Sequence, residues 1–156
     1  MGMGLFRKAK KTGADKMSSP EMVAMQEQMH ALMVQGKDFA EAHGLGYTRS
    51  EMAQVEDIIA AALEQSLTDD AKRVLHRQVT GYLYATIIRD FPDRWFVSSA
   101  PGNPVIMVVG EPRNNVKVLG WQKVEGRISN GAEDNLQFFY EGIVDYSERP
   151  GVHTLM

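Results

Sequence analysis

The chain has 156 residues, of which 44% are hydrophobic and 24% are charged, a composition typical of one folded domain with a single core. Residues 1–19 carry five basic residues and one acidic residue, a net charge of +4, whereas residues 20–156 carry 12 basic and 19 acidic residues, a net charge of −7. The absence of cysteine excludes disulfides, thiolate nucleophiles and cysteine-based zinc sites. The acidic body argues against nucleic-acid binding, which depends on clustered cations.

No apolar run approaches the roughly 18–20 residues that a helix needs to span a bilayer, and the longest lies at 105–109. Residues 1–16 also lack the apolar segment and the cleavage site of a secretory signal. We therefore expect a cytoplasmic protein.

The first 19 residues are a basic head with a single apolar pair, Leu5 and Phe6. Glycines and the lack of a sustained apolar face predict a flexible tail. In an alternative interpretation the head contacts a membrane surface, because apolar residues can insert while cations lie on anionic lipid. The residues of this membrane contact would be Leu5, Phe6, Arg7, Lys8, Lys10 and Lys11.

The first helix is expected over 20–42, because Ser19 can cap it and Pro20 suits the first helical position. Gly36 is expected to weaken or break it. Its apolar residues follow the spacing of one helical face and are Met22, Met25, Met29, Leu32 and Met33. We interpret this methionine face as core, although such faces can also dock varied partner helices.

Two more helices follow. A T-x-x-E capping box at 48–51 predicts the start of the second, whose apolar face includes Met52, Val55 and Ile59. The third begins with acids at 69 and 70 and is expected to run to 87 or 88. It should stop before Pro92, since proline disfavours helical geometry in the preceding residue.

Strands are expected at 94–99 and 104–110, joined as a hairpin by the turn residues at 100–103. Residues 105–109 are apolar at every position, which indicates that this strand is covered on both faces. A third strand is expected near 115–119.

Beyond Gly120 the hydrophobic period changes to that of helices. Trp121, Val124 and Ile128 predict a short helix that stops at Gly131. The last helix is expected to open with Glu133 and Asp134, in agreement with the helix dipole. Its buried face should consist of Leu136, Phe139, Tyr140, Ile143 and Val144.

These elements predict an α+β fold, with a single globular domain at 20–148. Three N-terminal helices should precede a small antiparallel sheet of two to three strands, on which a short helix and a C-terminal helix pack. Residues 149–156 are expected to be a C-terminal tail.

The four histidines form no pair with metal-ligand spacing. His30 and His76 fall outside the apolar faces of their helices and are expected to be solvated. His43 should lie at a helix end, where a cation suits the dipole, and His153 in the tail.

Acidic pairs offer no better reaction centre. The pairs at 69–70 and 133–134 suit helix N-termini, and the pair at 56–57 is expected on a solvated face. The chain also lacks a nucleophile elbow, a phosphate-binding loop and a dinucleotide-binding loop. We therefore predict no catalytic residue, no metal site and no cofactor.

Phe138, Phe139 and Tyr140 are consecutive on a predicted helix, so they cannot all point into the core. Aromatic side chains are enriched in the hot spots of protein interfaces. Phe138 lies off the buried face and is the candidate for contact with a partner.

Several segments together resemble a group of small bacterial proteins of the domain-of-unknown-function kind. These segments are G-L-G-Y-T-R-S-E (44–51), G-Y-L (81–83), R-W (94–95), the P-V strand (104–109) and W-Q-K-V-E-G-R-I-S-N-G-A-E-D-N-L-Q-F-F-Y (121–140). The resemblance spans roughly residues 38–146. It implies an α+β domain and brings no catalytic residues.

The leading functional hypothesis is a non-enzymatic protein-interaction domain of the adaptor, accessory or immunity type. The acidic body would suit a basic protein partner through electrostatic complementarity. Two alternatives stay open: a small enzyme or ligand-binding domain whose site is assembled from distant residues, and a membrane-surface protein that uses the basic head. The sequence leaves the partner and the oligomeric state open.

Overall fold

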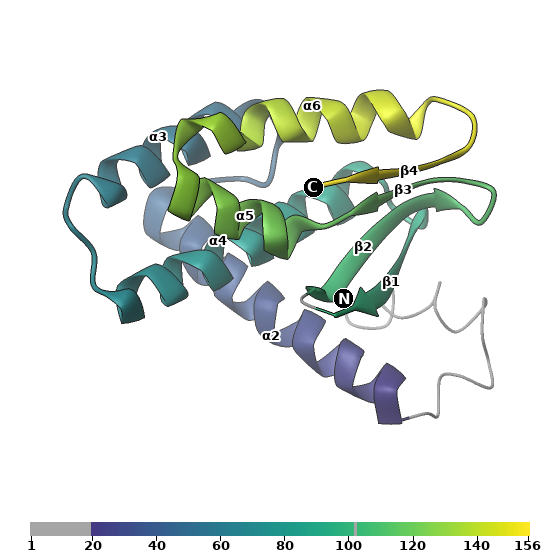
Figure 1. Ribbon diagram of the computed structural model, residues 1–156, viewed down its shortest axis with the longest axis horizontal. Coiled ribbons are helices and arrows are strands. Elements are labelled where there is room, and N and C mark those ends of the chain that lie inside the picture. Colours follow the sequence, from purple (N-terminus) through teal and green to yellow (C-terminus); the bar gives the residue numbers. More distant parts are fainter. Residues whose placement is uncertain (1–19, 102) are drawn as a thin grey trace.

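The computed structural model describes residues 20–101 and 103–156, so the basic head lies outside the described residues. Over the described ranges the fold is α+β, with five α-helices and a four-stranded sheet (Figure 1). The helical elements are α2 (Pro20–His43), η2 (Arg49–Glu51), α3 (Met52–Leu63), α4 (Asp69–Asp90), α5 (Gly120–Asn130), η3 (Ala132–Asp134) and α6 (Leu136–Ser147). The strands are β1 (Trp95–Ala100), β2 (Asn103–Glu111), β3 (Asn114–Val118) and β4 (Val152–Leu155).

The sheet has the order β1-β2-β3-β4 and is mixed. β1, β2 and β3 pair antiparallel, as expected, but β4 runs parallel to β3, with Val116 opposite His153. The prediction of a purely antiparallel sheet of two to three strands is therefore wrong, and the expected tail contributes the fourth strand. Four residues are too few to show a strand period, and the partner strand lies 34 residues away in the sequence, beyond α5 and α6.

β2 is the central apolar strand that the sequence indicates. Its odd-numbered residues, Val105, Met107 and Val109, belong to the main core, whereas Ile106 and Val108 lie on the opposite face and are also buried. The expectation that both faces of this strand are covered is confirmed.

α2 and α4 cross in close contact at Gly36 and Gly81. A Cβ atom on Gly81 would lie 1.8 Å from the carbonyl oxygen of Leu32, and one on Gly36 would lie 2.4 Å from the carbonyl carbon of Gly81. The two glycines let the helix backbones touch, and α2 continues through Gly36 without a break. The expectation that Gly36 weakens or breaks the helix missed this packing role.

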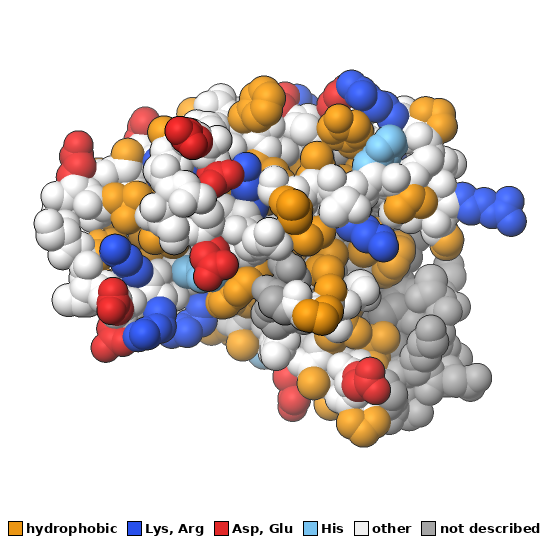
Figure 2. Space-filling model, viewed as in Figure 1, with side chains coloured by type: hydrophobic (Ala, Val, Ile, Leu, Met, Phe, Trp, Pro, Cys, Tyr) orange, Lys and Arg blue, Asp and Glu red, His pale blue; other side chains and the backbone are white. Residues whose placement is uncertain are grey.

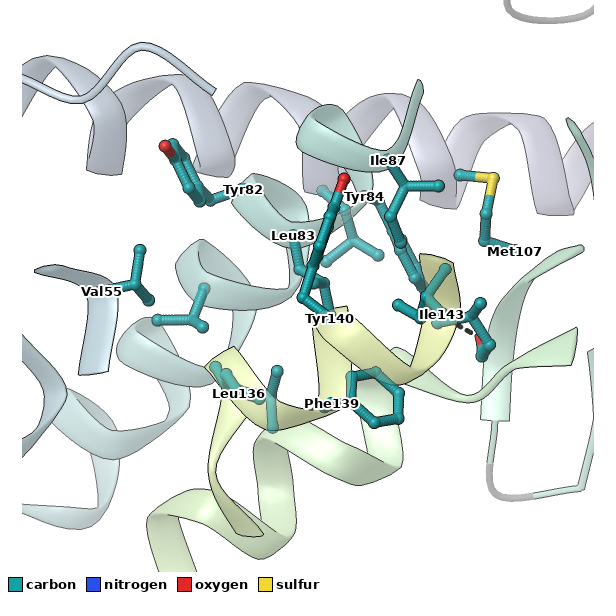
Figure 3. Packing of buried hydrophobic residues seen from close by; sticks show 14 of the residues in the cluster. Val55, Tyr82, Leu83, Tyr84, Ile87, Met107, Leu136, Phe139, Tyr140 and Ile143 are labelled. Atoms are coloured by element: carbon teal, nitrogen blue, oxygen red, sulfur yellow. Dashed lines mark hydrogen bonds between the residues drawn. The ribbon is translucent and has the colours of Figure 1, made fainter. Parts of the chain in front are cut away.

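The main core lies between α4, α6 and the sheet (Figure 3). Leu83 and Ile87 of α4 lie near Tyr140 of α6, whereas the Tyr82 ring contacts Phe39 of α2 and Tyr47. The methionine face of α2 is largely core: Met29 is fully buried, and Met25 and Met33 pack against the core while half-buried.

A buried hydroxyl fixes α4 to the sheet. The hydroxyl of Tyr84 donates a hydrogen bond of 2.7 Å to the carbonyl oxygen of Val105 on β2. Burial raises the pKa of Tyr84, so the phenol keeps the proton that this hydrogen bond requires. A buried polar group is thereby satisfied, as stable packing demands.

The helix starts follow the sequence signals except at the last helix. The capping box of Thr48 and Glu51 is present, although its first turn is the 3-10 segment η2, and Thr68 caps α4 by accepting a hydrogen bond from the Ala71 amide. The last helix starts later than expected, because residues 132–134 form η3 and Asn135 caps α6. No helix among the described residues combines the length and apolar character that a bilayer crossing requires.

Candidate interaction site

Phe138 is the most exposed large hydrophobic side chain of the described residues, at 82%. Its neighbours Phe139 and Tyr140 are 5% and 0% exposed, and both point from α6 into the core (Figure 3). Successive helical residues are rotated by about 100°, so burial of the next two residues directs Phe138 outward. The predicted orientation of Phe138 is observed, and its contact with a partner stays a prediction.

The backbone beneath Phe138 is fixed by the cap of α6. The side-chain oxygen of Asn135 accepts a hydrogen bond of 2.9 Å from the amide of Phe138. This bond satisfies one of the free amides at the helix start. Phe138 is thus presented from an ordered first turn.

A groove of about 570 Å³ lies beside Phe138, between α6, α5 and the C-terminal strand. Phe139, Gly142 and Leu155 contribute apolar surface to it, and the exposed side chain of Met156 stands at one end. Gly142 has no side chain to fill this space. Figure 2 shows this face, with apolar side chains reaching the surface among charged ones.

The charged residues of the groove are all engaged in ion pairs. Lys123 is 2.9 Å from Asp134, Glu141 pairs with Arg49, and Asp145 pairs with Arg149. The hydrogen bond from Arg49 lowers the pKa of the Glu141 carboxyl, so this group is ionised at neutral pH. A general base would need a pKa near neutrality, so Glu141 does not suit that role.

A buried ion pair supports the start of α6. Glu56 of α3 accepts a hydrogen bond of 2.8 Å from the Arg127 side chain of α5. Its second carboxylate oxygen accepts a bond of 2.6 Å from the amide of Leu136, the first residue of α6. One carboxylate therefore joins the three helices that position Phe138.

The expectation that Glu56 lies on a solvated face is wrong, because both Glu56 and Arg127 are buried. The helical spacing of α3 already indicates that Glu56 is buried. Glu56 lies four residues after Met52 and three before Ile59, so it falls on the buried face of α3. Its partner Arg127 lies 71 residues further on, and no local pattern connects the two.

A second polar contact joins α6 to the end of α4. The Tyr140 hydroxyl donates a hydrogen bond of 2.6 Å to a carboxylate oxygen of Asp90. Burial and the adjacent Asp90 carboxylate raise the pKa of Tyr140, so its phenol remains a donor. This contact fixes the buried side of the helix that exposes Phe138.

None of the four histidines is among the residues that line the groove. His76 was expected to be solvated, but its Nε2 atom is 2.8 Å from the carbonyl oxygen of Trp121 and the two rings are 3.8 Å apart. His43 ends α2 as expected, and His30 is exposed. His153 lies in β4 against Tyr146. Among the described residues, no group of three or more histidines or acids could hold a metal ion.

The residues of the predicted membrane contact are Leu5, Phe6, Arg7, Lys8, Lys10 and Lys11, and they lie outside the described residues. Their role therefore stays a prediction. Comparison of the chain with protein-family models, curated proteins and solved structures finds no match.

Proposed function

We propose that this protein is a non-enzymatic protein-interaction domain, of the adaptor, accessory or immunity type, that holds a protein partner in the groove beside Phe138. The observation that carries the proposal is the 82% exposure of Phe138 on a capped helix at the edge of that groove. Exposed large apolar groups next to a concave surface are typical of interaction sites.

Burial of a phenylalanine ring is the main energetic contribution expected from this surface. Moving such a side chain out of water contributes about 2 kcal/mol, and the fixed backbone lowers the entropy lost on binding. Phe138 would thus act as an aromatic anchor, while Met156 and Leu155 would provide adaptable apolar surface around it.

The charge of the domain favours a basic partner. Residues 20–156 carry a net charge of −7, and the Glu141 and Asp145 side chains beside the groove are about half exposed. Because each carboxylate keeps about half of its surface exposed beside its arginine partner, a cationic group of a partner protein can still reach it. We infer a partner that presents an apolar anchor flanked by lysine or arginine, which would be attracted by the acidic surface.

Affinity capture from a lysate of the source organism tests this proposal. The wild-type protein should retain a reproducible partner that Phe138→Ala loses. Val74→Ala is the matched control, because Val74 is an exposed apolar residue of α4 outside the groove, and this variant should retain the partner. Identical captured proteins for all three baits, or no reproducible partner, would contradict the proposal.

A stability measurement separates loss of contact from loss of fold. Substitutions of exposed side chains usually change the free energy of unfolding by less than about 0.5 kcal/mol. Phe138→Ala and Val74→Ala should therefore unfold at nearly the same urea concentration as the wild-type protein. A large destabilisation by Phe138→Ala would mean that its ring is part of the fold and would weaken the proposed role.

A further inference from the structure

A second concave site lies between α2 and α4, close to the contact of Gly36 with Gly81. It is a pocket of about 500 Å³, a volume in the usual range of small-molecule sites. Its lining residues are Met33, Lys37, Tyr47, Ala85, Ile88 and Arg89. They come from α2, α4 and the loop at 44–48, which are separate in the sequence.

The floor of this pocket is apolar. Met33 lies one helical turn before Gly36, and Ala85 and Ile88 lie one and two turns after Gly81. The three side chains are only partly buried, so their apolar surface is accessible. Because Ala85 carries only a methyl group, it leaves space between the two helices.

The wall of the pocket is held in place before any ligand binds. The Tyr47 amide donates a hydrogen bond of 3.0 Å to the Tyr82 hydroxyl, and the two rings stack with centroids 5.2 Å apart. Arg89 donates a bond of 3.0 Å to the carbonyl oxygen of Gly46. Tyr47 also has a φ of 62°, a strained conformation for a bulky residue that persists only where the surroundings enforce it.

The rim presents hydrogen-bond donors and positive charge. Within the described ranges, Lys37 has no ion pair, and Arg89 uses only one of its donors, on Gly46. The Tyr47 hydroxyl likewise has no hydrogen-bond partner in this part of the chain, and partial burial raises its pKa, so it is a neutral donor. These groups could satisfy the oxygens of an anion.

Two acids lie close to this rim. Glu41 acts on Tyr47 through its charge, and Glu51 acts on Arg89 in the same way. The Glu51 carboxylate is already engaged, since it accepts hydrogen bonds from the amides of Gly46 and Thr48 and from the Thr48 hydroxyl. It therefore leaves most donors of Arg89 available for a ligand.

We propose that this pocket binds a small amphipathic anion, namely a medium-chain carboxylate, with its alkyl chain on Met33, Ala85 and Ile88. Its carboxylate lies at the rim, where Lys37, Arg89 and the Tyr47 hydroxyl supply positive charge and donors. The combination of an apolar floor with a cationic rim selects this chemistry over a neutral or cationic molecule of the same length. The pocket shares no lining residue with the groove beside Phe138.

Titration of the full-length protein with octanoate tests the proposal. Binding is followed by the NMR signal of the Met33 side-chain methyl group, which lies in the pocket. Octanoate should produce a saturable shift, whereas octanol and octylammonium should bind at least about tenfold more weakly. No saturable shift at millimolar octanoate, or equal binding of the three compounds, would overturn the proposal.

Two variants locate the binding site. Ala85→Leu fills the pocket with a side chain that helices accept readily, and it should abolish octanoate binding. Lys37→Glu should raise the Kd for octanoate about tenfold, because it reverses a charge at the rim. Lys72→Glu is the matched control on an exposed position of α4 outside the pocket and should leave the Kd unchanged.

Unchanged octanoate binding by both Ala85→Leu and Lys37→Glu would place the ligand elsewhere and overturn the proposal. Lys37 is exposed, so its variant should fold even if Ala85→Leu does not. Phe138→Ala should bind octanoate like the wild-type protein. Failure of the partner-binding proposal would therefore leave this test intact.

Discussion

The α2–α4 side and the α5–α6 side of the molecule are held together by different interactions. On the first side, Gly36 and Gly81 bring two helix backbones into contact without any side chain between them. On the second, the buried ion pair of Glu56 and Arg127 joins α3 and α5 to the start of α6. The first contact tolerates no added atom, whereas the second tolerates no lost charge.

The two sides also carry different candidate sites. The pocket beside the glycine contact has a cationic rim in which Lys37 lacks an ion pair among the described residues. The groove beside Phe138 has paired charges and an exposed ring. We propose a small anion for the pocket because charge is available at its rim, and a protein surface for the groove because an exposed ring stands beside it.

Among the substitutions that compare the two sides, Glu56→Ala should have the largest effect on the free energy of unfolding. The substitution leaves the Arg127 guanidinium buried without its partner and removes the acceptor of the Leu136 amide. We expect a loss of about 4 kcal/mol in the free energy of unfolding, measured by urea denaturation. Asp57→Ala changes the exposed neighbouring acid and should cost less than about 0.5 kcal/mol. Equal effects of the two variants would contradict the role assigned to the buried pair.

Gly81→Ala tests the contact of α2 with α4. It should lower the free energy of unfolding by about 3 kcal/mol, since its Cβ would overlap the carbonyl oxygen of Leu32. Gly142→Ala is the matched control on α6, where the added Cβ would meet only Leu155 Cδ1 at 3.5 Å. Because alanine favours helix interiors over glycine, this variant should stabilise the protein by about 0.7 kcal/mol. Urea denaturation of both variants should therefore show opposite signs. Destabilisation by Gly142→Ala as large as that by Gly81→Ala would contradict the claim that the contact of α2 with α4 is the one that requires glycine.

The smallest expected effect on stability comes from the protonation of His76. This residue of α4 contacts Trp121 of α5 and so joins the two sides. Burial lowers the pKa of His76 below its ordinary value of 6.5, so the folded state binds fewer protons than the unfolded state as the pH falls through 6.5. Stability should therefore decrease from neutral pH to the folded-state pKa and then become constant with respect to this group. Urea denaturation of wild type and His76→Asn at several pH values checks this, because the variant should lack that part of the slope. Identical pH slopes would contradict the assignment.

The sequence predicts those features that depend on local spacing. Thr48 and Glu51 mark one helix start, and the acids at 69 and 70 mark another, because these signals lie within the first turn of the helix. The outward orientation of Phe138 follows from the helical period alone. The hairpin of β1 and β2 is likewise local, since its strands are consecutive.

Features that depend on distant partners could not be predicted in the same way. Gly36 looks like a helix-weakening residue until Gly81 is placed against it, and Glu56 looks solvated until Arg127 is known. β4 is difficult to predict for the same reason, because its partner β3 lies two helices earlier in the chain. The candidate groove is therefore only partly predictable: the helical period identifies Phe138, whereas the sequence predicts a tail for Leu155 and Met156, which line the groove.

Site-specific photocrosslinking is the most direct test of the proposed contact between Phe138 and a protein partner. A photoreactive phenylalanine analogue replaces either Gln137, which neighbours Phe138 on α6, or Val74, which lies outside the groove; both are exposed. After illumination in the source cells, the analogue at position 137 should form a covalent adduct with one defined protein, which the analogue at position 74 should not form. The additional substitution Phe138→Ala should remove this adduct. An adduct that forms equally from both positions, or that persists without the Phe138 ring, would contradict the proposed interaction site.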